Sequence, residues 1–62
     1  MAFKDNMRAE RARKGMSQPE LAEELGTSVR RITQMETGKI DPKLGEINKM
    51  AEIFKCSTKD LI

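Results

Sequence analysis

The chain has 62 residues, with 12 basic and 10 acidic side chains and a formal net charge of +2. A chain of this length forms one domain at most, so we treat residues 1–62 as a single domain. Its single cysteine and its lack of histidine exclude an internal disulfide and a zinc site built from cysteine and histidine, and we expect no metal ion and no other cofactor.

Apolar residues recur at helical spacing, and no segment shows the apolar–polar alternation of a strand. The first expected helix covers residues 3–14, where Phe3 and Met7 lie on one face. Gly15 follows as the residue that ends this helix, because glycine readily adopts the left-handed conformation common after a helix.

The second expected helix covers residues 18–25 and ends at Gly26. Ser17 and Glu20 have the spacing of a capping box, in which each side chain accepts a hydrogen bond from the other residue's backbone N–H. The apolar stripe of this helix consists of Leu21, Ala22 and Leu25.

The third expected helix covers residues 29–36, with Ser28 as its N-cap and Ile32 and Met35 on its inner face. The turn before it is too short for the two helices to pack along their length as an antiparallel hairpin. We therefore expect them to cross steeply, so that residues 18–36 form a helix-turn-helix.

A fourth helix is expected over residues 43–55, and the spacing of Ser57 and Asp60 predicts a short fifth helix. The apolar side of the fourth helix consists of Leu44, Ile47, Met50, Ala51 and Phe54. The predicted fold is therefore an all-α domain of five short helices.

The outward side of the third helix contains no acidic residue. It consists of Ser28, Val29, Arg30, Thr33, Gln34 and Thr37. A solvated helix face usually mixes glutamate with lysine. Base edges in DNA instead require arginine or glutamine donors, hydroxyl groups and a small apolar group for a thymine methyl. This side therefore has the composition of a surface that binds bases.

Charge is unevenly distributed along the chain. The net charge is +3 over residues 1–14, −3 over residues 15–26 and +2 over residues 27–39. Basic segments on both sides of an acidic one suit a polyanionic partner, although a solvated surface of mixed charge explains the same totals.

A set of residues spread over nearly the whole chain matches one family in order and spacing. The set is Arg11, Gly15-Met16-Ser17-Gln18, Glu20-Leu21-Ala22, Leu25-Gly26, Ser28, Ile32, Glu36, Gly38-Lys39, Pro42, Ala51, Cys56-Ser57 and Asp60-Leu61. In these residues the chain resembles the DNA-binding domain of the Cro/CI-type (XRE-family) phage and bacterial repressors. The resemblance implies a lambda-repressor-like domain whose third helix enters the major groove.

The resemblance also implies which residues contact DNA. The expected base-reading residues are Ser28, Val29, Arg30, Thr33 and Gln34. The expected contacts with the DNA backbone are Gln18, Arg11, Arg31, Thr37, Lys39 and Lys43. Arg11 has a second implied role, in an ion pair with Glu36 that ties the first helix to the end of the third.

Some of these positions allow two interpretations. Val29 is either a contact for a thymine methyl or a half-buried packing residue. Arg31 points away from the base-reading side at helical spacing, so it contacts phosphate or is simply solvated. Thr27 and Glu10 depart from the family, which commonly has aliphatic residues there, and they make the expected core more polar.

The function predicted from the sequence is a DNA-binding transcription regulator, a repressor that binds double-stranded operator DNA as a homodimer on an inverted repeat. The alternative is a protein-interaction module of the same fold, such as an antitoxin or a regulatory subunit. An enzyme is disfavoured because few residues are available to build a catalytic site. We expect no small-molecule ligand and no membrane partner, and a cytoplasmic, nucleoid-associated location for a protein encoded by a bacterium or a phage.

Overall fold

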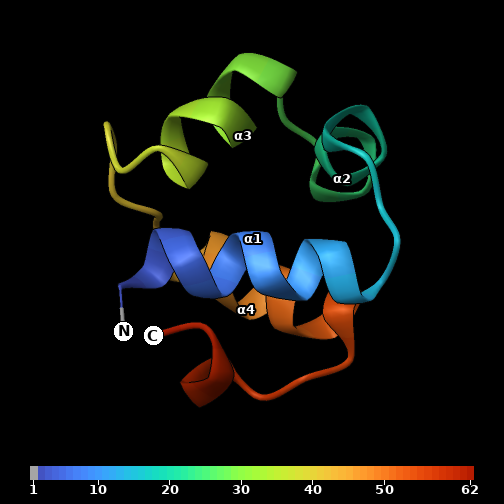
Figure 1. The fold of residues 1–62 in the computed structure, drawn as a ribbon, viewed down its shortest axis with the longest axis vertical. Coiled ribbons are helices and arrows are strands. Elements are labelled where there is room, and N and C mark those ends of the chain that lie inside the picture. The colour runs from blue at the N-terminus through green and yellow to red at the C-terminus, as the bar shows by residue number, and fades with distance from the viewer. Residues whose placement is uncertain (1) are drawn as a thin grey trace.

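The computed structural model of the protein describes residues 2–62, and these residues form α-helices and one short 3-10 turn, with no strand among them. The α-helices are α1 (Phe3–Arg13), α2 (Gln18–Leu25), α3 (Val29–Glu36) and α4 (Leu44–Phe54). In the view of Figure 1, α2 and α3 lie above α1, α4 lies behind it, and the C-terminal segment passes below. The prediction of an all-α fold is confirmed. No helix in the described part of the chain is long and apolar enough to cross a membrane.

The prediction of a fifth helix is wrong, because the C-terminal segment forms only a single 3-10 turn, η1 (Thr58–Asp60). The expected capping contact is present, since the Ser57 N–H donates to the Asp60 carboxylate at 3.0 Å. A capping contact starts a turn but does not extend it into an α-helix, and η1 contains three residues. The structure therefore has four α-helices, α1 to α4, in the part of the chain that it describes.

Helices α2 and α3 have the bounds predicted for them, because local side-chain caps fix where they begin. The Ser17 hydroxyl accepts from the Glu20 N–H at 3.2 Å, and the Glu20 carboxylate accepts from the Ser17 N–H at 2.8 Å. The Ser28 hydroxyl accepts from the Arg31 N–H at 3.1 Å. These bonds satisfy backbone donors that have no partner within the helix.

Helices α1 and α4 are slightly shorter than predicted. The first ends at Arg13, and the fourth begins at Leu44 and ends at Phe54. Lys55 stops α4 in a left-handed conformation, with φ 54° and ψ 47°. Glycine usually occupies this position, because a side chain is crowded in this conformation. A lysine here did not indicate from the sequence that the helix ends.

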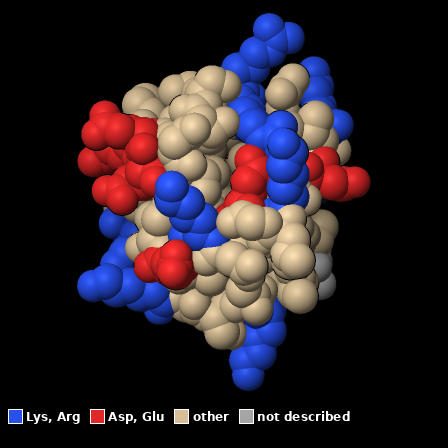
Figure 2. Space-filling view, turned by 180° about the vertical axis from the view of Figure 1, so that it is seen from behind, with Lys and Arg blue, Asp and Glu red and all other residues tan. Residues whose placement is uncertain are grey.

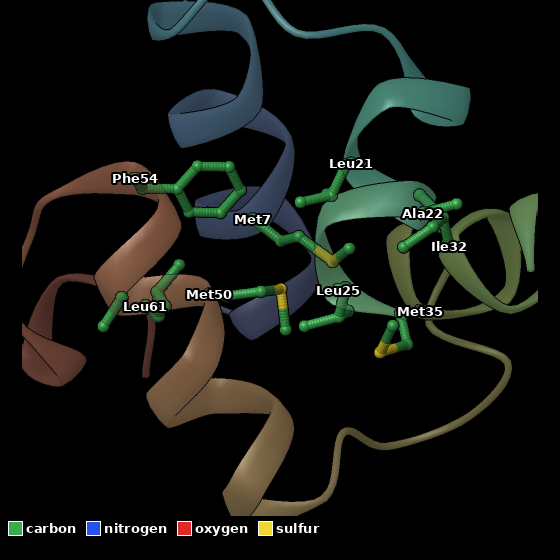
Figure 3. Close-up of a cluster of buried hydrophobic side chains, with 10 residues drawn as sticks. Met7, Leu21, Ala22, Leu25, Ile32, Met35, Met50, Phe54 and Leu61 are labelled. Carbon is green, nitrogen blue, oxygen red and sulfur yellow. The ribbon is translucent and has the colours of Figure 1, made fainter. Parts of the chain in front are cut away.

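The core draws on every helix and on the segment after η1. Its buried residues are Met7, Leu21, Ala22, Leu25, Ile32, Met35, Met50, Ala51, Phe54 and Leu61. Figure 3 shows the side chains of Met7 and Met50 extending between the helices in the same direction, with Phe54 beside Met7. The predicted inner faces of α2 and α3 do meet in this core.

Leu44 is not part of the core, although it was predicted on the apolar side of the fourth helix. Its side chain is 73% exposed. Leu44 is the first residue of α4, so it stands at the helix end, before the helix passes over the core. Helical spacing identifies a common face, but it does not show how far along that face the core extends.

Arg13 fastens α1 to the far end of α4, a contact that the sequence did not suggest. Its guanidinium donates to the Phe54 carbonyl oxygen at 2.9 Å and to the Glu10 carboxylate at 2.8 Å. The first bond satisfies a carbonyl group in the last turn of α4, and a cation suits this negative end of the helix dipole. Glu10, a departure from the family pattern, is thus half-buried in an ion pair.

Candidate nucleic-acid interface

A tight turn joins α2 to α3. Gly26 adopts a left-handed conformation with φ 77°, and the Thr27 N–H donates to the Ala22 carbonyl oxygen at 2.9 Å. Figure 1 shows α2 nearly end-on and α3 across the view, so the two helices cross steeply. This geometry buries the inner faces of both helices and leaves the opposite side of α3 outside the core.

The outer side of α3 borders an open hollow of about 370 Å³. Five side chains line it, all of which the sequence placed among the expected DNA contacts: Arg30, Thr33, Gln34, Thr37 and Lys39. Ser28 and Val29 lie at the other end of this side of α3, outside the hollow. Val29 is 40% exposed, so its side chain is partly packed against the protein and partly accessible to a partner.

Three of the five side chains that border the hollow have no hydrogen-bond partner in the described part of the chain. The side chains of Arg30, Gln34 and Lys39 take part in none of the hydrogen bonds or ion pairs formed within residues 2–62. The Thr33 and Thr37 hydroxyls instead donate to backbone carbonyl oxygens one turn earlier, at 3.1 and 2.9 Å. The hollow therefore presents two cations and one amide to an outside partner.

The last residue of α3 is held in place by a buried carboxylate. Glu36 is 3% exposed and accepts three hydrogen bonds. The Arg11 guanidinium donates to its two oxygens at 2.6 and 3.2 Å, and the Gln18 amide donates at 3.0 Å. A third donor of Arg11 reaches the Met16 carbonyl oxygen at 2.9 Å. The ion pair is thus present, and it uses two of the Arg11 donors on Glu36.

The first turn of α3 is held by a second ion pair, which no sequence pattern indicated. The Arg31 guanidinium donates to both oxygens of Glu46 on α4, at 2.6 and 2.8 Å. Hydrogen bonds from Arg31 and, more weakly, from the Lys43 N–H lower the pKa of Glu46 below its ordinary value of 4.5, although burial opposes the shift. The two residues are 15 positions apart in different helices, so no local pattern links them.

Charge is unevenly distributed around the helix-turn-helix. Figure 2, seen from behind, shows basic side chains projecting at the top, the end where α3 lies in Figure 1. Acidic side chains gather at the upper left of the same view, on the side of α2. A surface hollow lined partly by Glu20, Glu23 and Glu24 belongs to that acidic side. An anion is therefore favoured at α3 and disfavoured at the outer face of α2.

A steeply crossed helix pair with a polar, acid-free outer side on its second helix defines a helix-turn-helix domain. A family model described as helix-turn-helix matches residues 7–61 of this chain. An uncharacterized HTH-type transcriptional regulator of Archaeoglobus fulgidus is 36% identical over 59 residues, which cover 95% of this chain and 84% of that protein. The chain belongs to the helix-turn-helix family of DNA-binding proteins, and its resemblance to the XRE-family regulators is confirmed.

Proposed function

We propose that this protein is a transcriptional repressor that reads double-stranded operator DNA through α3 and binds an inverted repeat as a dimer. The observation that supports it best is the outer side of α3. Arg30 and Gln34 on this side, and Lys39 just after the helix, have no side-chain partner within residues 2–62, while both ends of α3 are anchored by ion pairs. The relative from Archaeoglobus fulgidus is described as a transcriptional regulator, which agrees with this proposal.

Base recognition is assigned to the exposed side chains of α3. Arg30 suits the O6 and N7 acceptors of guanine, and Gln34 suits the N6 and N7 groups of adenine. Each good bidentate contact discriminates against the wrong base by roughly 1–3 kcal/mol. Ser28 and Thr33 supply hydroxyl groups, and the half-exposed Val29 offers an apolar contact for a thymine methyl.

Contacts with phosphate are assigned to residues around this surface. Lys39 and Lys43 are exposed cations, and Thr37 stands at the C-terminal end of α3. Gln18 lies at the start of α2, and its amide retains a second hydrogen after binding Glu36. Arg11 stays in this group as a second role, because Glu36 and Met16 accept only three of its five N–H donors.

We infer from the family resemblance that the dimer surface lies near the loop of residues 39–43 and η1. Leu44 follows this loop and exposes a large apolar side chain, and Ile62 after η1 is 66% exposed. A dimer on an inverted repeat would place its two α3 helices in major-groove segments about 34 Å apart.

Selection of bound duplexes from a random DNA pool at about physiological salt tests this function. Enrichment of an inverted repeat, with half-sites about one helical turn apart, is the expected result. Binding that stays non-specific and falls steeply with salt would contradict it. That outcome would favour the alternative of a protein-interaction module, which a nuclease-insensitive complex with another protein would then identify.

A further inference from the structure

The first turn of α3 contains two adjacent arginines, Arg30 and Arg31, and of the two Arg31 forms an ion pair within the described residues. We propose that Arg31 is a positioning residue for DNA recognition: its fork with Glu46 fixes the first turn of α3 against α4, which leaves Arg30 as the cation of that turn available to DNA. This proposal rests on the proposed function, and it removes Arg31 from the expected phosphate contacts.

The geometry of the pair supports a fixed contact. Both Arg31 hydrogen bonds are short, and the two side chains are only 29% and 16% exposed. Glu46 also accepts the Lys43 N–H at 2.8 Å, which caps the start of α4. One carboxylate therefore joins the start of α4 to the start of α3. A forked guanidinium suits this task, because its two parallel donors match a carboxylate in one orientation.

The pair completes the anchoring of α3. Glu36 ties the C-terminal end of the helix to α1 and α2, whereas Arg31 ties its N-terminal end to α4. Within the described residues, the Arg31 bonds are the side-chain hydrogen bonds that join α3 to α4. Side chains recognise base edges at hydrogen-bond distances. A recognition helix that shifts by a fraction of an ångström therefore loses discrimination between base sequences before it loses attraction to phosphate.

Helix electrostatics supply an independent reason for the partner. Arg30 and Arg31 occupy the first turn of α3, which contains no acid. The N-terminal end of a helix carries a partial positive charge, so a cation there is repelled by it. Glu46 compensates for this at Arg31. Arg30 has no carboxylate within 4.0 Å in residues 2–62. Its positive charge is therefore available to DNA phosphates and to hydrogen-bond acceptors on bases.

The experiment measures binding to two duplexes of about 20 base pairs, one enriched by selection and one of mixed sequence. The variants are Arg31→Gln, Glu46→Gln, the double variant and Arg31→Lys. Matched controls are Arg8→Gln, in an exposed ion pair on α1, and Glu52→Gln, exposed on α4. The readouts are the ratio of the two affinities and the dependence of mixed-sequence binding on salt. Partial unfolding lowers both affinities by the same factor, so it leaves the ratio unchanged.

We expect Arg31→Gln, Glu46→Gln and the double variant to lower the affinity ratio alike, by about tenfold, as for residues that act in one network. Arg31→Lys should not restore the ratio, because an ammonium cannot form the fork. The salt slope, which is the steepness with which the logarithm of the binding constant falls with the logarithm of the salt concentration, should stay unchanged. Loss of one phosphate contact would lower it by about 0.9. The two control variants should retain both the ratio and the slope.

Two results would overturn the proposal while leaving the function intact. One is an unchanged affinity ratio in Arg31→Gln and Glu46→Gln. The other is a salt slope that falls in Arg31→Gln, is retained in Arg31→Lys and rises in Glu46→Gln, since this pattern identifies Arg31 as a phosphate contact. If the unsubstituted protein itself does not distinguish the two duplexes, the proposed function fails, and the role of Arg31 fails with it.

Discussion

Arg11 and Glu36 connect the middle of the chain to its first helix through two hydrogen bonds, of 2.6 and 3.2 Å, around a carboxylate that is almost fully buried. The Gln18 amide completes the shell of donors around Glu36. The contact therefore joins three helices at one carboxylate, and it sets the C-terminal end of α3 relative to the rest of the domain.

Glu36→Ala is expected to destabilise the fold by about 2–3 kcal/mol. Removing one partner of a fully buried pair costs about 3–5 kcal/mol, and partial exposure of Arg11 reduces this. For a domain of this size the melting temperature falls by about 4–8 °C per kcal/mol. The measurement is thermal unfolding followed by circular dichroism, with the exposed Glu24→Ala as a control. An unchanged melting temperature in Glu36→Ala would show that the pair contributes nothing to stability.

Arg30→Ala and Lys39→Ala are expected to affect DNA binding in different ways. Arg30→Ala should change the base preference at one position, because it removes a base contact worth roughly 1–3 kcal/mol. Lys39→Ala should weaken binding to all duplexes equally and lower the salt slope by about 0.9. Repeating the duplex selection and the salt titration with each variant distinguishes the two effects. Identical behaviour of the two variants would refute this division of roles.

Leu44→Asp tests the placement of the dimer surface. Because Leu44 is 73% exposed, the change should leave the melting temperature nearly unchanged. It should weaken binding to a full inverted repeat while preserving binding to a single half-site, since only the full site brings two copies together. Titrating both duplexes by fluorescence anisotropy provides the comparison. An equal loss on both would place Leu44 at the DNA rather than between subunits.

Lys55→Gly is expected to stabilise the protein by about 0.5–1 kcal/mol. Lys55 has a positive φ of 54°, a conformation that crowds any side chain and that glycine adopts without strain. A thermal melt should therefore move to higher temperature. Lys49→Gly in the interior of α4 is the matched control and should lower stability by about 1 kcal/mol. A lower melting temperature for Lys55→Gly would mean that the lysine side chain makes a compensating contact.

Acid is expected to weaken the fold partly through Glu46. The pKa of Glu46 is lower in the folded protein than its ordinary value of 4.5, so the folded state binds fewer protons than the unfolded state in this range. The stability that the pair contributes is complete above the ordinary pKa and is lost as the pH falls through the lowered value. Urea unfolding at successive pH values below 6 should show a smaller acid loss in Glu46→Gln. An identical loss would exclude Glu46 as a source of the acid sensitivity.

Features fixed by neighbouring residues could be predicted from the sequence. The capping contacts at Ser17 and Ser28 lie within one turn, so both helices of the helix-turn-helix were placed correctly. The outer side of α3 predicted from helical spacing contained four of the five residues that line its hollow, and the family resemblance supplied the fifth, Lys39.

Features that depend on how distant segments meet could not be predicted. The contacts of Arg31 with Glu46 and of Arg13 with Phe54 join residues 15 and 41 positions apart, and either arginine is equally compatible with solvent when only its own helix is considered. The exposure of Leu44 has the same origin, because it depends on where α4 passes over the core rather than on spacing along α4. Resemblance to a family supplied the Arg11–Glu36 pair, but it supplied none of these three.

The shielded position of Glu36 has a consequence for how the protein leaves DNA. At physiological ionic strength, dissolved salt screens the attraction between exposed charges that lie more than about 8–10 Å apart. Buried ion pairs are screened much less. Cations that face phosphate are therefore screened at salt concentrations that leave the internal pairs intact. Rising ionic strength should detach a fully folded protein, ready to bind again when the salt is diluted.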